Sequence, residues 1–172
     1  MVAAENLPVQ FFEAAARFQD SVAFQIKRDG RYVRWSYGEV ADQAHRLATF
    51  LRRIEISPGD RIALLSGNRP EWCVAYLGIV AAGATAVPLD VQLGVQELEN
   101  LLHHSESRAI VVSEAELDKV QPFMARLPSR PRVILLDEKA PTGTYTLAEI
   151  LRSSPRGPLP SVPSESPASI LY

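Results

Sequence analysis

The sequence predicts an α/β fold, a mostly parallel sheet flanked by helices and preceded by an N-terminal helix and a β-hairpin. Three observations carry this prediction. From residue 61 onward, short apolar runs of strand length alternate with segments of helical periodicity, which is typical of a parallel sheet covered on both faces. Before residue 61, two alternating runs flank an Asp-Gly pair instead. Of the 172 residues, 47% are hydrophobic and 22% are charged, so one core of ordinary size can form.

The first two elements are expected to be a short amphipathic helix and a hairpin. Apolar side chains recur every three to four residues, as on one face of a helix, in the stretch LPVQFFEAAARFQD. The hairpin is expected to turn at Asp29 and Gly30, the strongest short-range hairpin signal, within VAFQIKRDGRYVRWS.

A longer helix is expected to begin directly after the hairpin. Ser36 and Glu39 have the spacing of a capping box, in which each side chain accepts a hydrogen bond from the other residue's backbone N–H. The pair Pro58-Gly59 is expected to end this helix. Its apolar stripe consists of Val40, Ala44, Leu47, Leu51 and Ile54.

Strands and helices then alternate along the chain. Strands are expected at residues 61–66, 84–90, 108–114 and 132–137. Helices are expected at residues 68–83, 95–107, 115–127 and 146–152. The last of these helices has its own capping box, formed by Thr146 and Glu149. Right-handed crossovers should connect the parallel strands.

Several positions in this region have a structural interpretation. Asn68, with Pro70 and Glu71 in the first turn, is expected to cap the helix that follows the first parallel strand. Gly83 fits the C-terminal cap of the same helix. Pro88 should lie where the sheet needs no backbone amide.

The residues that follow each strand are the natural place for ligand contacts in a parallel sheet. The alternative interpretation of Asn68 is that it faces a ligand there together with Arg69. Asp90 and Asp137 each end a strand, as a phosphoacceptor aspartate does in a response-regulator receiver. The other acids and the lysine that a receiver uses do not assemble, so solvated strand-end acids are the preferred interpretation. Neither phosphate-binding motif, G-x-G-x-x-G or G-x-x-x-x-G-K-[ST], occurs in the sequence.

No catalytic or metal-binding set emerges from residue chemistry alone. His103 and His104 are adjacent on a helix, so their side chains diverge and cannot share a metal ion. Cys73, the only cysteine, lies in an apolar helix and is expected to be a small core residue. Trp72 and Tyr76 are interpreted as core residues in preference to an aromatic surface that binds a ligand. We therefore name no catalytic residue and no metal ligand.

Composition excludes several classes of function. A net charge of -2 without a clustered basic face argues against nucleic-acid binding. A single cysteine allows no intramolecular disulfide and fits a reducing compartment. The N-terminus lacks the pattern of a signal peptide, and no apolar stretch reaches the ~20 residues that span a bilayer. We expect a cytoplasmic protein without a transmembrane segment.

Two stretches go beyond a generic α/β pattern. The opening core region of the AMP-forming acyl-CoA synthetases, within the adenylate-forming ligase superfamily, resembles WSYGEVADQAHRLATFLRRIEISPGDRIALLSGNRPEW. The superfamily's second core motif resembles YLGIVAAGATAVPLD. The resemblance runs in order from about Asn6 to Glu114 and more weakly to Tyr172. Within the superfamily, the resemblance favours the fatty acid–CoA ligases. The segment NRPEW is similar to the corresponding segment of those ligases, and LDVQLGVQELE lacks the pattern of peptide-synthetase adenylation domains.

The resemblance implies a two-step reaction for the parent enzyme. A medium- or long-chain fatty acid attacks the α-phosphorus of ATP, giving an acyl-adenylate and pyrophosphate, and the CoA thiol then displaces AMP. ATP, Mg²⁺ and CoA are the implied cofactors and substrates. The family's Thr/Ser/Gly-rich phosphate loop would follow Tyr172, so we expect an N-terminal fragment that binds no cofactor, is inactive alone and serves as scaffold.

The expected organisation has three parts. Residues 1–152 form an incomplete α/β subdomain, residues 153–167 a Pro/Ser-rich connection, and residues 168–172 a strand leading into the phosphate loop. The expected partners are the remainder of the ligase chain and, through exposed surface, a second copy of this chain. A membrane-peripheral location stays open for the parent enzyme. The alternatives are a stand-alone binding or regulatory module without catalysis, and a receiver-like domain.

Overall fold

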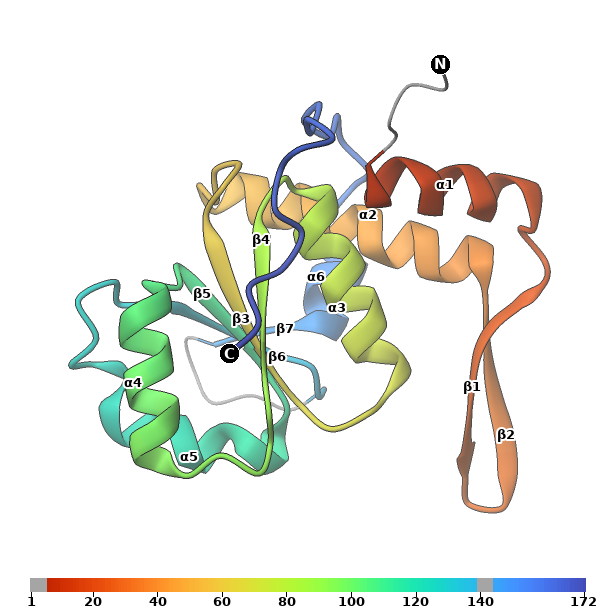
Figure 1. The fold of residues 1–172 in the computed structure, drawn as a ribbon. Coiled ribbons are helices and arrows are strands. Elements are labelled where there is room, and N and C mark those ends of the chain that lie inside the picture. The colour runs from red at the N-terminus through yellow and green to blue at the C-terminus, as the bar shows by residue number, and fades with distance from the viewer. Residues whose placement is uncertain (1–5, 139–143) are drawn as a thin grey trace.

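A five-stranded parallel sheet forms the centre of the computed structural model, which describes residues 6–138 and 144–172. The strand order is β4-β3-β5-β6-β7, which confirms the predicted fold class (Figure 1). The short edge strand β7 was not predicted from the sequence. The strands are β3 Arg61–Leu65, β4 Thr85–Leu89, β5 Ala109–Val112, β6 Arg132–Leu135 and β7 Tyr145–Thr146.

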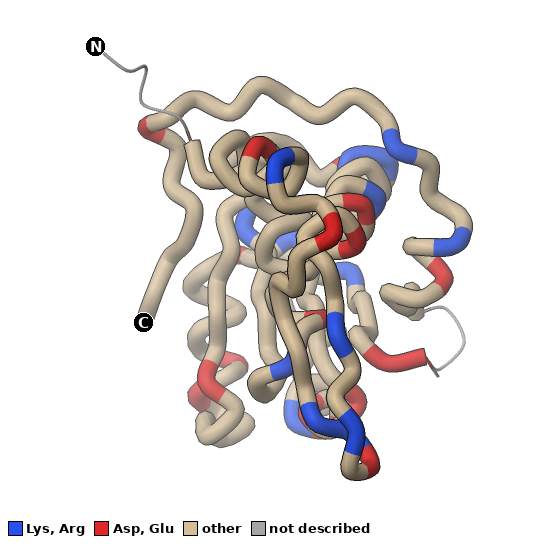
Figure 2. Tube along the Cα trace, turned by 90° about the vertical axis from the view of Figure 1, so that its right-hand side faces the viewer, with Lys and Arg blue, Asp and Glu red and all other residues tan. Residues whose placement is uncertain are grey.

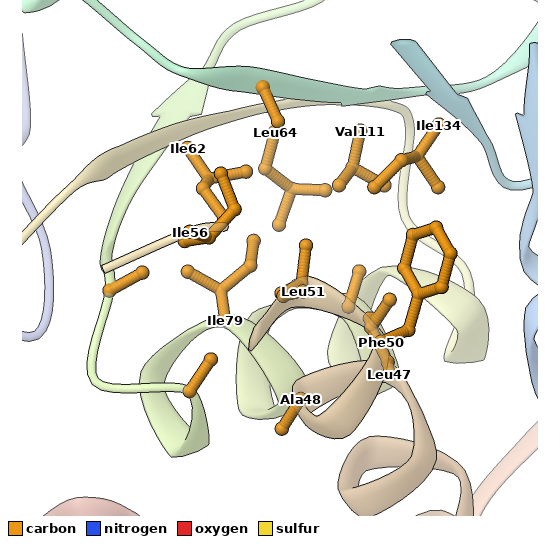
Figure 3. Packing of buried hydrophobic residues seen from close by; sticks show 14 of the residues in the cluster. Leu47, Ala48, Phe50, Leu51, Ile56, Ile62, Leu64, Ile79, Val111 and Ile134 are labelled. Carbon is orange, nitrogen blue, oxygen red and sulfur yellow. The ribbon is translucent and has the colours of Figure 1, made fainter. Parts of the chain in front are cut away.

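Helices cover both faces of this sheet because its strands are apolar on both sides. On one face lie α2 Tyr37–Arg53, α3 Pro70–Ala81 and α6 Leu147–Ser153. On the other face lie α4 Val95–Ser105 and α5 Glu114–Met124. Figure 3 shows the first core, where side chains of α2 and α3 point at side chains of the strands, such as Leu51 and Ile79 toward Ile62 and Leu64.

The N-terminal elements pack outside this three-layer body. Helix α1 Leu7–Arg17 lies against α2, and a separate two-stranded sheet is formed by β1 Val22–Arg28 and β2 Arg31–Ser36. The predicted hairpin turn is confirmed, with positive φ at Asp29 (49°) and Gly30 (77°). The hairpin projects from the body in Figure 1, and its basic residues gather around the tip in Figure 2.

Local signals set most helix ends, and one end was predicted wrongly. The capping box of Ser36 and Glu39 forms at the start of α2, with both reciprocal hydrogen bonds present (3.2 and 2.7 Å). At the other end, α2 stops at Arg53 rather than at Pro58, because Glu55 adopts a left-handed conformation with φ of 66°. Gly83 follows the C-cap of α3 with φ of 80°, a conformation that glycine adopts without strain.

Removing one half of the α2 capping box is the first testable prediction. Replacing Ser36 with alanine leaves the Glu39 backbone N–H without its acceptor, so the free energy of unfolding should fall by about 1 kcal/mol. Urea unfolding followed by circular dichroism measures this change. Ser161→Ala, at an exposed position outside helices and strands, is the matched control and should change stability by less than about 0.5 kcal/mol. Equal effects of the two substitutions would contradict the capping role.

The C-terminal segment runs beside β4 but forms only one bridge with it, between Ala86 and Ser169. The Ala86 N–H donates to the Ala168 carbonyl (2.9 Å), and the Ile170 N–H donates to the Ala86 carbonyl (2.9 Å). The backbone N–H groups of alternate residues in a strand point to the same side, so the backbone nitrogen of Pro88, two residues after Ala86, also faces this segment. The next hydrogen bond of the ladder would need an N–H there, and proline has none. The prediction of a strand over residues 168–172 was therefore wrong beyond this bridge.

Residues 154–167 contain no helix or strand, and they run over α2 rather than away from the body. The Ser154 carbonyl accepts from Arg46 (2.9 Å), and the Gly157 N–H donates to the Thr49 hydroxyl (3.1 Å). The expected unit of residues 1–152 includes residues 1–5 and 139–143, which lie outside the described residues, as does the start of the N-terminal stretch judged not to be a signal peptide.

Candidate functional site

The sheet has a topological switch point at its carboxyl edge. From β3 the chain moves to β4 on one side and then returns to place β5 on the other side. The connections after β3 and β5 therefore diverge and leave a crevice between them, the usual place for ligands in open parallel sheets. A cleft of about 500 Å³ occupies this position. We call it the switch-point cleft; it is lined by Ser66, Gly67, Asn68, Arg69, Ser113, Glu114, Ala115 and Asp137.

Arg69 is the cation of this cleft, and two carboxylates hold it. Its Nε donates to Glu71 Oε2 (3.0 Å), and its Nη1 donates to Asp137 Oδ1 (2.8 Å). Burial acts to lower the pKa of Arg69, but the hydrogen bonds to Glu71 and Asp137 outweigh it and raise the pKa above its ordinary value. Arg69 is thus a fixed positive charge between the ends of β3 and β6.

Glu71 extends this cluster to the hairpin. Its Oε1 accepts from Arg28 Nη2 of β1 (2.9 Å), while Oε2 accepts from Arg69. Burial acts to raise the pKa of Glu71, but hydrogen bonds from Arg69, from its own backbone N–H and from Arg28 lower it below the ordinary value. We call Arg28, Glu71, Arg69 and Asp137 the ion-pair network; it ties the hairpin to the carboxyl edge of the sheet.

Asp137 is not the solvated strand-end acid that the sequence predicted. Its Oδ1 binds Arg69, and its Oδ2 accepts a hydrogen bond from the Glu114 backbone N–H (2.7 Å) at the start of α5. Asp137 therefore serves as the cap of a helix whose own N-cap residue, Ser113, makes no side-chain capping bond. Asp90 does fit the interpretation of a solvated strand-end acid, because it is exposed and its side chain accepts a hydrogen bond from the nearby Gln92 N–H (2.8 Å).

These positions do not assemble a receiver-type phosphoacceptor site. Asp90 follows the edge strand β4, outside the set of residues that line the cleft. Asp137 lines the cleft but is already bound by Arg69 and by the start of α5. At the end of the central strand β5, which adjoins the switch point, the chain has Ser113.

The prediction that Asn68 caps α3 was wrong. The N-cap is Arg69, in extended conformation, and Pro70 is the first helical residue, with no side-chain hydrogen bond at the cap. Proline disfavours a helical conformation for the residue before it, so the helix cannot include Arg69 and the cap moves past Asn68. Asn68 instead lines the switch-point cleft next to Arg69, as in the alternative interpretation.

An apolar groove of about 420 Å³ adjoins the cleft and shares Asn68 and Arg69 with it. Its walls come from Phe24 and Ile26 of the hairpin and from Trp72 and Cys73 of α3. The prediction that Cys73 is a core residue was wrong, since it is only half-buried and lines this groove. Burial raises the pKa of its thiol, so Cys73 is a poor nucleophile near neutral pH.

Trp72 and Tyr76 combine the two roles that the sequence left open. Their rings stack at 5.6 Å with an interplanar angle of 4°, and both pack partly against the core. Trp72 also lines the apolar groove. The Tyr76 hydroxyl is 2.9 Å from the Ser169 hydroxyl, which attaches the C-terminal segment to α3.

The cleft offers hydroxyl, amide and guanidinium groups, together with the N-termini of α3 and α5, and these suit a polar or anionic ligand. The described residues that line it include no histidine, cysteine or lysine, and Asp137, one of its two carboxylates, is already hydrogen-bonded to Arg69 and to the Glu114 backbone N–H. His103 and His104 are exposed on α4, away from the cleft. Within residues 6–138 and 144–172, no group of three or more His, Cys, Asp or Glu side chains could hold a metal ion.

Sequence reasoning missed Ser66, Ser113 and the contact between Arg69 and Asp137. The available signal was that polar residues follow β3, β5 and β6, whose carboxyl ends meet at one edge of the sheet. Which strands adjoin at that edge depends on the strand order, which the sequence did not predict. In the described part of the chain, no helix is both long enough and apolar enough to cross a membrane.

Three comparisons bear on this arrangement. A family model described as AMP-binding enzyme matches residues 11–172. The chain is similar to 4-hydroxybutyrate–CoA ligase 2 of Metallosphaera sedula, with 27% identity over 95% of this chain and 30% of that protein. It is also similar to the long-chain-fatty-acid–CoA ligase FadD13 of Mycobacterium tuberculosis, with 32% identity over 71% of this chain and 23% of that protein.

Solved structures share the fold. The coronafacic acid ligase of Pectobacterium brasiliense superposes with a TM-score of 0.85 and 24% identity, covering 98% of this chain and 33% of that structure. This chain thus spans about a third or less of the length of these curated relatives and of this solved structure.

Proposed function

This chain belongs to the AMP-binding enzyme family, and from that premise we propose that it forms the N-terminal part of an AMP-forming acyl-CoA ligase. The observation that carries the proposal is the match of the family model to nearly the whole chain, residues 11–172. The CoA ligases among its relatives support the reaction class. In this proposal the whole protein joins a carboxylate to CoA at the expense of ATP. Because the chain belongs to this family, we no longer propose the alternative that it is a receiver-like domain.

The role proposed for this chain is to form one wall of the ligase's ligand site. The switch-point cleft lies at the carboxyl edge of the sheet, where open parallel sheets bind ligands. The described residues supply no ligand set for Mg²⁺ and no lysine in the cleft for ATP phosphates. They do not fit the complete ATP–Mg²⁺ group, so we derive no catalytic step from them, and the remainder of the ligase is the proposed source of those groups.

A medium- or long-chain fatty acid is the proposed substrate. The similarity to the long-chain-fatty-acid–CoA ligase FadD13 supports this choice. The similarity to a 4-hydroxybutyrate–CoA ligase makes a short hydroxy acid the competing substrate. A cytoplasmic location is proposed as well, supported by the single cysteine, Cys73, which is a free thiol.

Carboxylate-dependent exchange of pyrophosphate into ATP tests the proposal. The whole ligase should catalyse the exchange with decanoate or palmitate and more slowly with 4-hydroxybutyrate. The 172-residue chain alone should show none above the level without carboxylate, because its cleft lacks the groups that bind the triphosphate. Exchange by this chain alone would contradict the scaffold role. A whole protein that forms no acyl-CoA from any carboxylate would contradict the ligase proposal, in favour of a module without catalysis.

A further inference from the structure

Another cavity, which shares no lining residue with the switch-point cleft or the apolar groove, lies between α1, α2 and the connection that follows α6. Its volume is about 480 Å³, within the usual range for small-molecule sites. Apolar side chains make most of its wall, including Phe12 and Ala15 of α1, Ala41 of α2 and Leu159 of the connection. Three polar residues also line it, Gln19, His45 and Arg156. We call it the α1–α2 cavity.

Arg156 is held at this cavity by its neighbours in sequence. The Ser154 carbonyl is bound by Arg46 (2.9 Å), and the Gly157 N–H is bound by Thr49 (3.1 Å), so both flanks of Arg156 are fixed to α2. Among the described residues, no carboxylate forms an ion pair with Arg156. Arg156 is exposed, so water solvates its charge, and it has no ion-pair partner in the part of the chain that the structure describes.

The pKa of His45 is lowered in part by the same positive charge. Burial lowers the pKa of His45, and the nearby Arg156 lowers it further; Asp42 acts in the opposite direction, and Arg46 adds to the lowering. Asp42 pairs with Arg46 at 2.7 Å on the same helix rather than with Arg156. His45 Nδ1 is buried without a hydrogen-bond partner, so no acceptor at that nitrogen stabilises the protonated ring. The imidazole is neutral at pH 7 and packs against the Phe12 ring at 5.9 Å.

We propose that the α1–α2 cavity binds a small amphipathic monocarboxylate, with its carboxylate at Arg156 and its hydrocarbon tail between Phe12, Ala15 and Leu159. An apolar cavity with one unpaired cation complements a ligand that has an apolar body and one negative end. The carboxylate supplies the missing counter-charge, and the guanidinium can bind it through two parallel hydrogen bonds. The tail is removed from water against the apolar wall. This site is separate from the proposed ligase site and does not depend on ligase activity.

Octanoate is a suitable probe, and the His45 ring signals in NMR spectra of the 172-residue chain are the readout. A saturable shift is expected at pH 7, with a dissociation constant of about 1 mM or tighter. Because the bound carboxylate offsets the charge of Arg156, the pKa of His45 should rise when octanoate is present. Octan-1-ol, which has the tail without the charge, should bind about tenfold more weakly.

Two variants and one control make the assignment specific. Arg156→Gln should weaken octanoate binding about tenfold and leave octan-1-ol binding unchanged. Ala16→Leu obstructs the cavity from an exposed position on α1, where leucine is still a good helix former, and should abolish the saturable shift without unfolding the chain. Arg152→Gln, on α6 and outside the cavity, should bind octanoate like the unmodified chain.

The proposal fails if octanoate causes no saturable shift at His45 below its micelle-forming concentration. It also fails if Arg156→Gln and Arg152→Gln bind octanoate equally, or if binding persists in Ala16→Leu. Octanoate that binds only at the apolar groove of Trp72 would shift the Trp72 indole signal and not His45. That result would overturn this inference and leave the proposed ligase function untouched.

Discussion

Replacing Phe123 with alanine is expected to lower the free energy of unfolding by about 3–5 kcal/mol. Phe123 is fully buried, and it is the largest of the fully buried side chains in the described part of the chain. It lies in α5 and packs into the core beneath the sheet together with Leu98 and Leu102 of α4. Alanine removes most of that volume, and the surrounding helices cannot collapse fully into the space because strands and loops hold both ends of each.

Urea unfolding followed by circular dichroism gives the measurement. Phe18→Ala is the matched control, because Phe18 is the same residue type but 45% exposed, with Arg17 over its ring. That change should cost less than about 1 kcal/mol. Loss of similar stability in both variants would show that α5 is not packed into the core as described.

Replacing Arg69 with methionine is expected to cost about 2–3 kcal/mol and to disturb the candidate site directly. Methionine keeps much of the length of the side chain but removes the hydrogen bonds to Glu71 and Asp137. The side chains of these two acids are only 17% and 25% exposed, so water compensates them incompletely. Arg34→Met is the control, since Arg34 is exposed on the hairpin, and it should change stability by less than about 0.5 kcal/mol.

The effect of Arg69→Met should shrink at acidic pH. The hydrogen bonds that lower the pKa of folded Glu71 stabilise the protein above pH 4.5, the ordinary value of the carboxyl group. That contribution is lost as the pH falls below 4.5 and through the lower folded pKa, because the carboxyl then binds a proton. In the variant Glu71 retains only Arg28 as a side-chain partner, so its pKa rises and less stability remains to be lost. Urea midpoints at neutral pH and below pH 4.5 measure this, and a difference between variant and unmodified chain that is constant with pH would contradict it.

Local sequence signals predicted the local structure well. The turn at Asp29 and Gly30 and the capping box of Ser36 and Glu39 both involve residues within three positions of each other. Their energetics depend on backbone geometry that is the same in any fold. The end of α2 was missed because Glu55 adopts a positive φ that no glycine or proline signals, while the nearest such signal stands at Pro58.

The candidate site could be predicted only in part. Asn68, Arg69 and Asp137 were recognised as strand-end residues, yet their roles were assigned one by one. Arg69 and Asp137 are 68 positions apart, and their hydrogen bond exists because β3 and β6 lie on either side of β5. Asp137 also takes over the capping of α5, a role that the neighbouring residues alone would give to Ser113.

The amino-acid sequence by itself determined most of the elements, the parallel α/β class and the family, because hydrophobic period, turn residues and motif spacing are properties of contiguous segments. The tertiary structure alone decided the strand order β4-β3-β5-β6-β7, and with it the switch-point cleft, the ion-pair network and the α1–α2 cavity. Each of these joins residues from different elements. Strands that are apolar on both faces can be ordered in several ways at similar local energy, and the choice among them depends on the packing of the whole core.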